Sequence, residues 1–126
     1  MSRTLTEKLL DRAATGETIE GSQWREVRPD LVLGHDATIA LIVDRIARHG
    51  HPLANPERLF LVADHFAPPS TVDRANILRR FLDFVEGSGL LEAGGTLEMM
   101  QGICHQVLVE SPRCVPGSVI VGADSQ

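Results

Sequence analysis

The sequence predicts an α/β domain with a mostly parallel sheet, and three features lead to that class. Short apolar runs typical of strands alternate with longer amphipathic segments typical of helices. The clearest run, Leu59–Ala63, is apolar at every position, which is typical of a strand covered on both faces. The length of 126 residues suits one such domain, which we expect to span residues 1–126.

The composition excludes several classes of protein. Hydrophobic residues make up 43% and charged residues 23%, as in globular proteins. The net charge is −5, with 12 Lys and Arg against 17 Asp and Glu, which argues against a broad nucleic-acid surface. No apolar stretch approaches the roughly 18 residues of a membrane helix, and the N-terminal segment has no secretory apolar region. We expect a soluble, cytoplasmic protein that binds neither nucleic acid nor membrane.

The first elements are a helix and a short strand. Thr4 and Glu7 have the spacing of a capping box, which predicts a helix start, and Gly16 is a plausible end. A short strand is expected over Trp24–Val27.

A strand and a long helix follow. The apolar run after Asp30 ends at Gly34 and suits a short buried strand. The helix is expected to begin at Asp36 or Thr38 and to run to Arg48, with a glycine just beyond its end. Its apolar residues fall on one face: Ile39, Ile42, Val43 and Ile46.

The second half repeats this alternation. Ser70 is expected to cap an amphipathic helix over Thr71–Val85. A weak strand is expected over Leu97–Met100, followed by a segment, 102–110, that begins as a loop and ends as a short helix. Gly117–Val121 is expected to be the last strand.

Ionisable side chains follow the expected strands where each strand ends. The carboxyl ends of parallel strands form the crevice where ligands bind in open α/β sheets. Histidine exchanges protons near neutral pH, and a neighbouring carboxylate orients it and stabilises its charged form. The sequence therefore predicts a polar site at this edge, with Asp36 as a helix N-cap and His35 in a solvated loop as the structural alternative. The residues that follow the strands are His35, Asp36, Asp64, His65, His105, Asp124 and Ser125.

The chain has two cysteines, which is too few for a disulfide-rich scaffold or a four-cysteine metal site. Cys104 stands beside His105, but sequence neighbours rarely point at each other, so we expect Cys104 to be a packed residue. Cys114 is expected to lie in a loop.

Five segments together resemble one known family: TLTEKLLDRAATG, DLVLGHDATIALIVDRI, LFLVADHFAPPS, GICHQVL and PGSVIVGADS. In this order they resemble the aconitase family, and within it the N-terminal segment of the 3-isopropylmalate dehydratase and homoaconitase large subunits. The resemblance runs from Thr4 to Ser125. It implies a three-layer α/β/α fold, the first part of the cluster-bearing region.

The resemblance also implies an activity and a cofactor. Enzymes of this family are hydro-lyases that isomerise small hydroxy-polycarboxylic acids by dehydration and rehydration. A 4Fe–4S cluster held by three cysteines supplies a Lewis-acidic iron in the complete enzyme. Cys104 and Cys114 do not match the ligand motifs, so we expect no cluster to be ligated by this chain alone.

Site residues carry over from the matching motifs. Asp64 and His65 match the pair that protonates the leaving hydroxyl, and His105 matches another catalytic histidine. Asp124 matches an aspartate that supports the histidines. The substrate contacts would be His35 and Ser125.

The chain also departs from the family pattern, because Gln126 stands where a histidine is usual and the cluster cysteines, the arginine clamp and the serine base are missing. We therefore expect an N-terminal piece that is inactive alone. Its partners would be the remainder of the large subunit or a companion chain, and a small swivel-domain subunit. The alternatives are an interaction module without catalysis and, less favoured, a metal hydrolase using His35, Asp64, His65 and His105.

Overall fold

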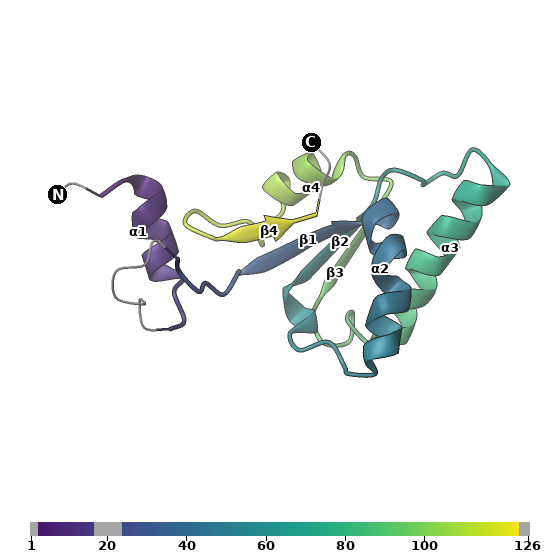
Figure 1. Cartoon of the computed structure of the whole chain (residues 1–126). Helices are drawn as coiled ribbons and strands as arrows, with labels where there is room; N and C mark the ends of the chain where they lie inside the picture. The colour runs from purple at the N-terminus through teal and green to yellow at the C-terminus, as the bar shows by residue number, and fades with distance from the viewer. Residues whose placement is uncertain (1–2, 17–23, 124–126) are drawn as a thin grey trace.

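Four parallel strands form one sheet in the computed structural model, which describes residues 3–16 and 24–123. The strand order is β3-β2-β1-β4, and every neighbouring pair is parallel (Figure 1). This confirms the α/β class with a parallel sheet. The strands are β1 (Leu31–His35), β2 (Leu59–Ala63), β3 (Thr96–Met99) and β4 (Ile120–Gly122).

Helices cover both faces of this sheet. Helices α2 (Asp36–His49) and α3 (Val72–Gly87) lie together on one face, and α4 (Cys104–Glu110) lies on the other (Figure 1). The three-layer α/β/α arrangement is therefore confirmed. Helix α1 (Leu5–Arg12) lies apart from α2 and α3, and a 3₁₀ turn at Pro56–Arg58 leads into β2.

The core has two parts because successive side chains of a strand point to opposite faces. On one face, Leu61 and Ala63 of β2 pack with α2 and α3. On the other face, Phe60 and Val62 pack with Cys104 and Leu108 of α4. All four of these β2 side chains are fully buried, which is why this strand is apolar throughout.

Two of the expected helix boundaries are fixed by the local signals in the sequence. The Thr4 hydroxyl accepts a hydrogen bond from Glu7 N at 3.2 Å, and Thr4 N donates to the Glu7 carboxylate at 2.7 Å. This is the expected capping box. Helix α2 ends at Gly50, whose φ of 65° is a left-handed conformation that glycine adopts without strain.

Two local expectations are wrong. No strand forms over Trp24–Val27 in the described part of the chain, where Val27 makes only an isolated antiparallel bridge with Ala14. The cap of α3 is Thr71, whose hydroxyl accepts from Arg74 N at 3.2 Å. Ser70 instead accepts a hydrogen bond from the Arg74 guanidinium at 2.8 Å.

The elements of the C-terminal half are confirmed with small shifts. The expected strand over Leu97–Met100 is β3, which begins one residue earlier. The segment 102–110 begins as a loop and ends as α4, as expected. The last strand is shorter than expected, because only Ile120–Gly122 pair with β1. Among the described residues, no helix is both long and apolar enough to cross a membrane.

Candidate active site

The carboxyl end of β1 is a switch point, because the direction in which the sheet grows reverses there. The chain moves outward from β1 to β2 and β3, and then returns to place β4 on the other side of β1. Ligands bind at such a switch point in open α/β sheets. His35 ends β1 there, and Ala123 N at the end of β4 donates to the carbonyl of Leu33 at 3.4 Å. Asp124 and Ser125, which are also expected at this edge, lie outside the described residues.

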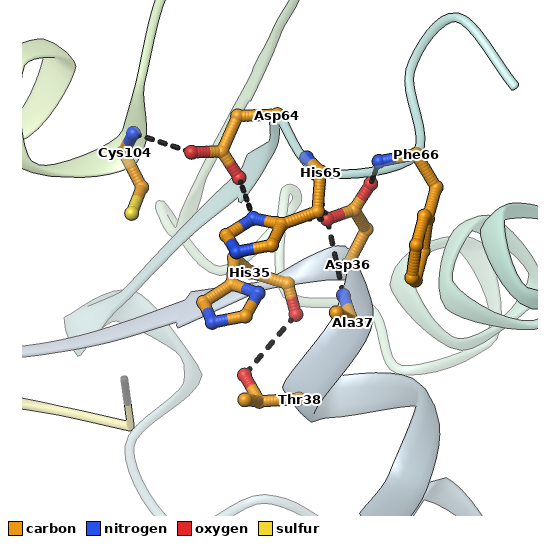
Figure 2. A network of polar contacts seen from close by, with 8 residues as sticks. All are labelled: His35, Asp36, Ala37, Thr38, Asp64, His65, Phe66 and Cys104. Carbon is orange, nitrogen blue, oxygen red and sulfur yellow. Dashed lines mark hydrogen bonds and ion pairs between the residues drawn. The ribbon is translucent and has the colours of Figure 1, made fainter. Parts of the chain in front are cut away.

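The pairing of β1 with β2 brings two pairs of ionisable residues together. His35, the last residue of β1, pairs with Val62, so the Asp64-His65 pair directly after β2 lies beside the His35-Asp36 pair at the end of β1. Each of these four residues offers one ligand atom within 4.8 Å of those of the others (Figure 2). The expected gathering of His35, Asp64 and His65 is therefore present.

Asp64 connects His65 to the start of helix α4. Its Oδ1 lies 2.7 Å from Nδ1 of His65, and its Oδ2 accepts a hydrogen bond from Cys104 N at 2.6 Å (Figure 2). Cys104 is the first residue of α4. Asp64 is thus fixed from two sides, and it fixes the imidazole of His65 in turn.

These contacts also set the charge of Asp64. Burial acts to raise the pKa of Asp64, but hydrogen bonds from the His65 ring and from Cys104 outweigh it, and the pKa is lowered. Asp64 is therefore a carboxylate at neutral pH and accepts hydrogen bonds only. His65 must then donate from Nδ1, which leaves Nε2 to exchange a proton with a ligand.

The lowered pKa of Asp64 makes stability depend on pH. A carboxylate with a lowered pKa stabilises the folded chain above its unfolded pKa of about 4, and this contribution is lost as pH falls through the folded pKa. We expect Asp64→Asn to lower the free energy of unfolding more at about pH 6 than at about pH 3, as measured by urea denaturation. Asp83→Asn, at an exposed position of α3, is the matched control. An Asp64→Asn effect that is equal at both pH values would contradict the expectation.

His35 is a buried residue whose ring stacks on His65. The two ring centroids are 3.9 Å apart and the planes differ by 6° (Figure 2). His35 is 3% exposed, whereas the His65 side chain is 40% exposed. The alternative that placed His35 in a solvated loop is therefore wrong. The stack presents one accessible imidazole supported by a buried one.

Asp36 is a buried member of this group of residues. The expectation that it is the N-cap of α2 is wrong, because His35 occupies the cap position and Asp36 is the first helical residue. Its side chain is fully buried against the loop after β2. The one signal in the sequence was the second His-Asp pairing at a strand end, His35-Asp36 beside Asp64-His65.

The two histidines and two aspartates could also hold a metal ion. However, the lone pairs of imidazole nitrogens lie in the ring plane, and the planes of His35 and His65 are parallel. The two rings therefore cannot both direct a lone pair at the same ion unless one of them turns. His105 is not in this group of donors. The arrangement favours proton transfer over chelation.

The start of α4 separates the two neighbours Cys104 and His105. Cys104 is 2% exposed and packs in the core, as expected. His105 is exposed in the first turn of the helix, directly after the residue that binds Asp64. Its backbone is therefore near the strand-end edge.

A separate hollow of about 550 Å³ lies between the C-terminal parts of α2 and α3. It has a mostly apolar lining that includes Val43, Ile46, Phe84 and His51. Helix α2 begins at Asp36, beside the other ionisable residues, and its 14 residues put its other end roughly 20 Å away. We place the site at the strand ends because the ionisable groups converge there.

Comparison with known proteins identifies the family. The model of the aconitase family (aconitate hydratase) matches residues 7–126. The chain belongs to the aconitase family. It is 36% identical over 126 residues to the 3-isopropylmalate dehydratase large subunit of Wolinella succinogenes, and 34% identical over 126 residues to large subunit 1 of this enzyme from Methanopyrus kandleri. It is 33% identical over 124 residues to the methanogen homoaconitase large subunit of Methanocaldococcus jannaschii.

These matches cover nearly the whole chain but a small share of each relative. The matches to the Wolinella succinogenes and Methanopyrus kandleri proteins each include 99% of this chain and 29% of the relative. The match to the Methanocaldococcus jannaschii protein includes 97% of this chain and 28% of the relative. The chain therefore spans about three-tenths of the length of the curated relatives it matches, in their N-terminal part.

The cysteines of this chain do not fit the iron–sulfur cluster that the family implies. Fe–S clusters are held by cysteine thiolates, usually four. The chain has two, of which Cys104 is packed in the core and Cys114 is half-buried. These two cysteines alone therefore cannot hold such a cluster.

Proposed function

We propose that the chain supplies the proton-donating part of an aconitase-family hydro-lyase that acts on a small hydroxy-polycarboxylate. His65 and Asp64 form the acid pair, His105 and Asp124 are further catalytic residues, and Ser125 contacts substrate. The buried His35 lines the substrate site beneath the His65 ring. Family membership and the similarity to dehydratase large subunits support this reaction class. The observation that carries it is the 2.7 Å contact between His65 Nδ1 and the Asp64 carboxylate.

The acid step follows from this contact. The charged imidazolium of His65 carries protons on both nitrogens, with Nδ1–H donating to Asp64. As the carbon–oxygen bond of the substrate breaks, Nε2 gives its proton to the departing hydroxyl, which leaves as water. His65 returns to its neutral form with the proton on Nδ1. Rehydration runs this step in reverse.

The remaining chemistry requires a partner. The base that takes the proton from the neighbouring carbon and the cysteines that bind the 4Fe–4S cluster would come from the remainder of the large subunit or a companion chain. A small swivel-domain subunit would complete the site, in agreement with relatives that are named large subunits. We propose that the chain alone is inactive. We call the chain together with these partners the assembled enzyme.

The second candidate, an interaction module without catalysis, is favoured by apolar side chains on the α4 and β4 side. Ile103, Val109 and Val121 are 67%, 66% and 51% exposed. The edge strand β4 has only three residues and pairs on one side with β1. Such a surface favours binding to another protein. It supports a partner under either candidate.

One experiment separates the two candidates. The chain is purified alone, and also co-expressed with the small subunit and the uncovered part of the large subunit of the Methanopyrus kandleri relative. We expect no turnover of 3-isopropylmalate or homocitrate by the chain alone, and co-purification with turnover for the co-expressed set. The same set with the relative's own N-terminal segment is the control.

The other outcomes are also decisive. Turnover by the isolated chain would contradict the proposed need for partners. Co-purification without turnover would overturn the catalytic proposal and favour the interaction module. If the chain failed to co-purify while the control segment assembled, the proposed partners would be wrong.

A further inference from the structure

One carboxyl side chain, that of Asp36, lies completely buried in the group formed with His35, Asp64 and His65. Asp36 has 0% exposure, and burial of a carboxylate is costly unless hydrogen bonds replace its water. Three backbone N–H groups donate to it, which suits the ionised form because that form only accepts. The donors are Ala37 N at 3.0 Å, His65 N at 3.2 Å and Phe66 N at 2.7 Å.

Two of these donors do not belong to the helix that carries Asp36. His65 and Phe66 are 29 and 30 residues away in the sequence, in the segment that follows β2. A helix cap alone would need only donors from its own first turn, such as Ala37. The carboxylate therefore joins the end of β1 to the end of β2, as Figure 2 shows.

The segment after β2 that Asp36 binds also carries His65, the proposed proton donor. Oδ1 of Asp36 lies 3.9 Å from Nδ1 of His65, and this nitrogen contacts Asp64 at 2.7 Å. The His35 ring covers one face of His65. The His65 side chain is 40% exposed, so its surroundings leave it room to turn if its backbone moves. The bonds from Asp36 fix that backbone.

We propose that Asp36 is a positioning residue that fixes the backbone of His65 and Phe66 and thereby holds the His65 ring with Nδ1 on Asp64. The inference rests on the proposed role of His65. It goes beyond that role because Asp36 makes no proton transfer itself. It acts through two backbone N–H groups.

Nuclear magnetic resonance of the isolated chain tests the inference without any activity measurement. In Asp36→Asn the side chain keeps its size, but one acceptor oxygen becomes an NH₂ group that cannot accept. His65 N and Phe66 N donate to different oxygens of Asp36, so one of the two loses its acceptor. Because a hydrogen bond contributes roughly the free energy of a tenfold change, we expect amide exchange to become about tenfold faster at His65 or Phe66, whichever faces the NH₂ group. The ring-nitrogen chemical shifts of neutral His65 should move from the Nδ1–H towards the Nε2–H tautomer.

Two further variants give this test its control and its rescue. Asp44→Asn changes an exposed aspartate of the same helix that pairs with Arg80 at 3.0 Å, and it should alter neither signal. Asp36→Glu keeps the carboxylate and should restore most of the Nδ1–H tautomer. A merely structural role would lower overall stability without changing the tautomer of the folded chain.

Each outcome of the test is decisive. Unchanged exchange and tautomer in a folded Asp36→Asn would overturn the inference, as would equal changes in Asp44→Asn. If Asp36→Asn did not fold, exchange in the unmodified chain would decide: protected amides at His65 and Phe66 support the inference, and unprotected ones overturn it. An inactive assembled enzyme with a normal His65 tautomer would count against the proposed function alone.

Discussion

Replacing His65 by glutamine is expected to lower the rate of dehydration by the assembled enzyme about 10²- to 10⁴-fold, the usual contribution of a positioned general acid. Glutamine keeps a hydrogen-bonding side chain, but it cannot carry a transferable proton at neutral pH. The departing hydroxyl would then have to leave without protonation. The loss should appear in kcat more than in KM, because the proton is transferred in the transition state.

The matched control is His51→Gln, at an exposed position beside the hollow between α2 and α3. Its rate should be unchanged, because the length of α2 separates it from His65 by roughly 20 Å. Steady-state assays of both variants, after assembly has been checked by size-exclusion chromatography, give the comparison. A kcat for His65→Gln within a few-fold of the unmodified enzyme would remove His65 from the acid role.

Much of the fold could be predicted because its signals are local. The apolar run of β2 has the length of one strand and is bounded by polar residues, so Leu59–Ala63 was predicted without error. The start of α1 and the end of α2 depend on Thr4 and Gly50, which act through their own backbone. Alternating helices and strands then left a parallel sheet as the natural class.

One error arose where two neighbouring residues offered the same local chemistry. Ser70 and Thr71 both carry a hydroxyl near the start of α3, and Thr71, which lies at the right distance from Arg74 N, is the cap.

The other error concerns the expected strand at Trp24–Val27. The residues around Trp24 have the composition of a strand but no neighbour in the described part of the sheet. A strand is stable only when another strand pairs with it, which a local pattern does not report.

The candidate site could be predicted in position but not in geometry. Strand-end positions indicated that His35, Asp64 and His65 would share one edge. The stacking of the two rings depends on the register that pairs His35 with Val62, and a shift by one residue would point His35 to the other face. The burial of Asp36 depends on the loop after β2 closing over it. Both are properties of the packed chain.

The largest expected loss of stability follows from truncating Phe81 to alanine. Phe81 is fully buried in α3, where it belongs to the core part that includes Ile39 and Leu61. Alanine would leave a cavity between the helix layer and the sheet, and such substitutions cost about 3–5 kcal/mol. This is a large share of the roughly 5–15 kcal/mol by which domains are stable. Urea denaturation should show the loss, followed by far-ultraviolet circular dichroism because Trp24 is 83% exposed and reports poorly on the core.

The same substitution at Phe84, one turn along α3, is the matched control. Phe84 is only half-buried and lines the hollow between α2 and α3, so its removal opens no closed cavity. We expect a loss of roughly 1 kcal/mol, the transfer free energy of its partly buried surface. Equal losses at Phe81 and Phe84 would mean that the layer between α3 and β2 is not close-packed. If the loss at Phe81 is larger by about 2 kcal/mol or more, the close-packed core lies between α3 and β2. This core would then also hold the end of β2 rigidly in place.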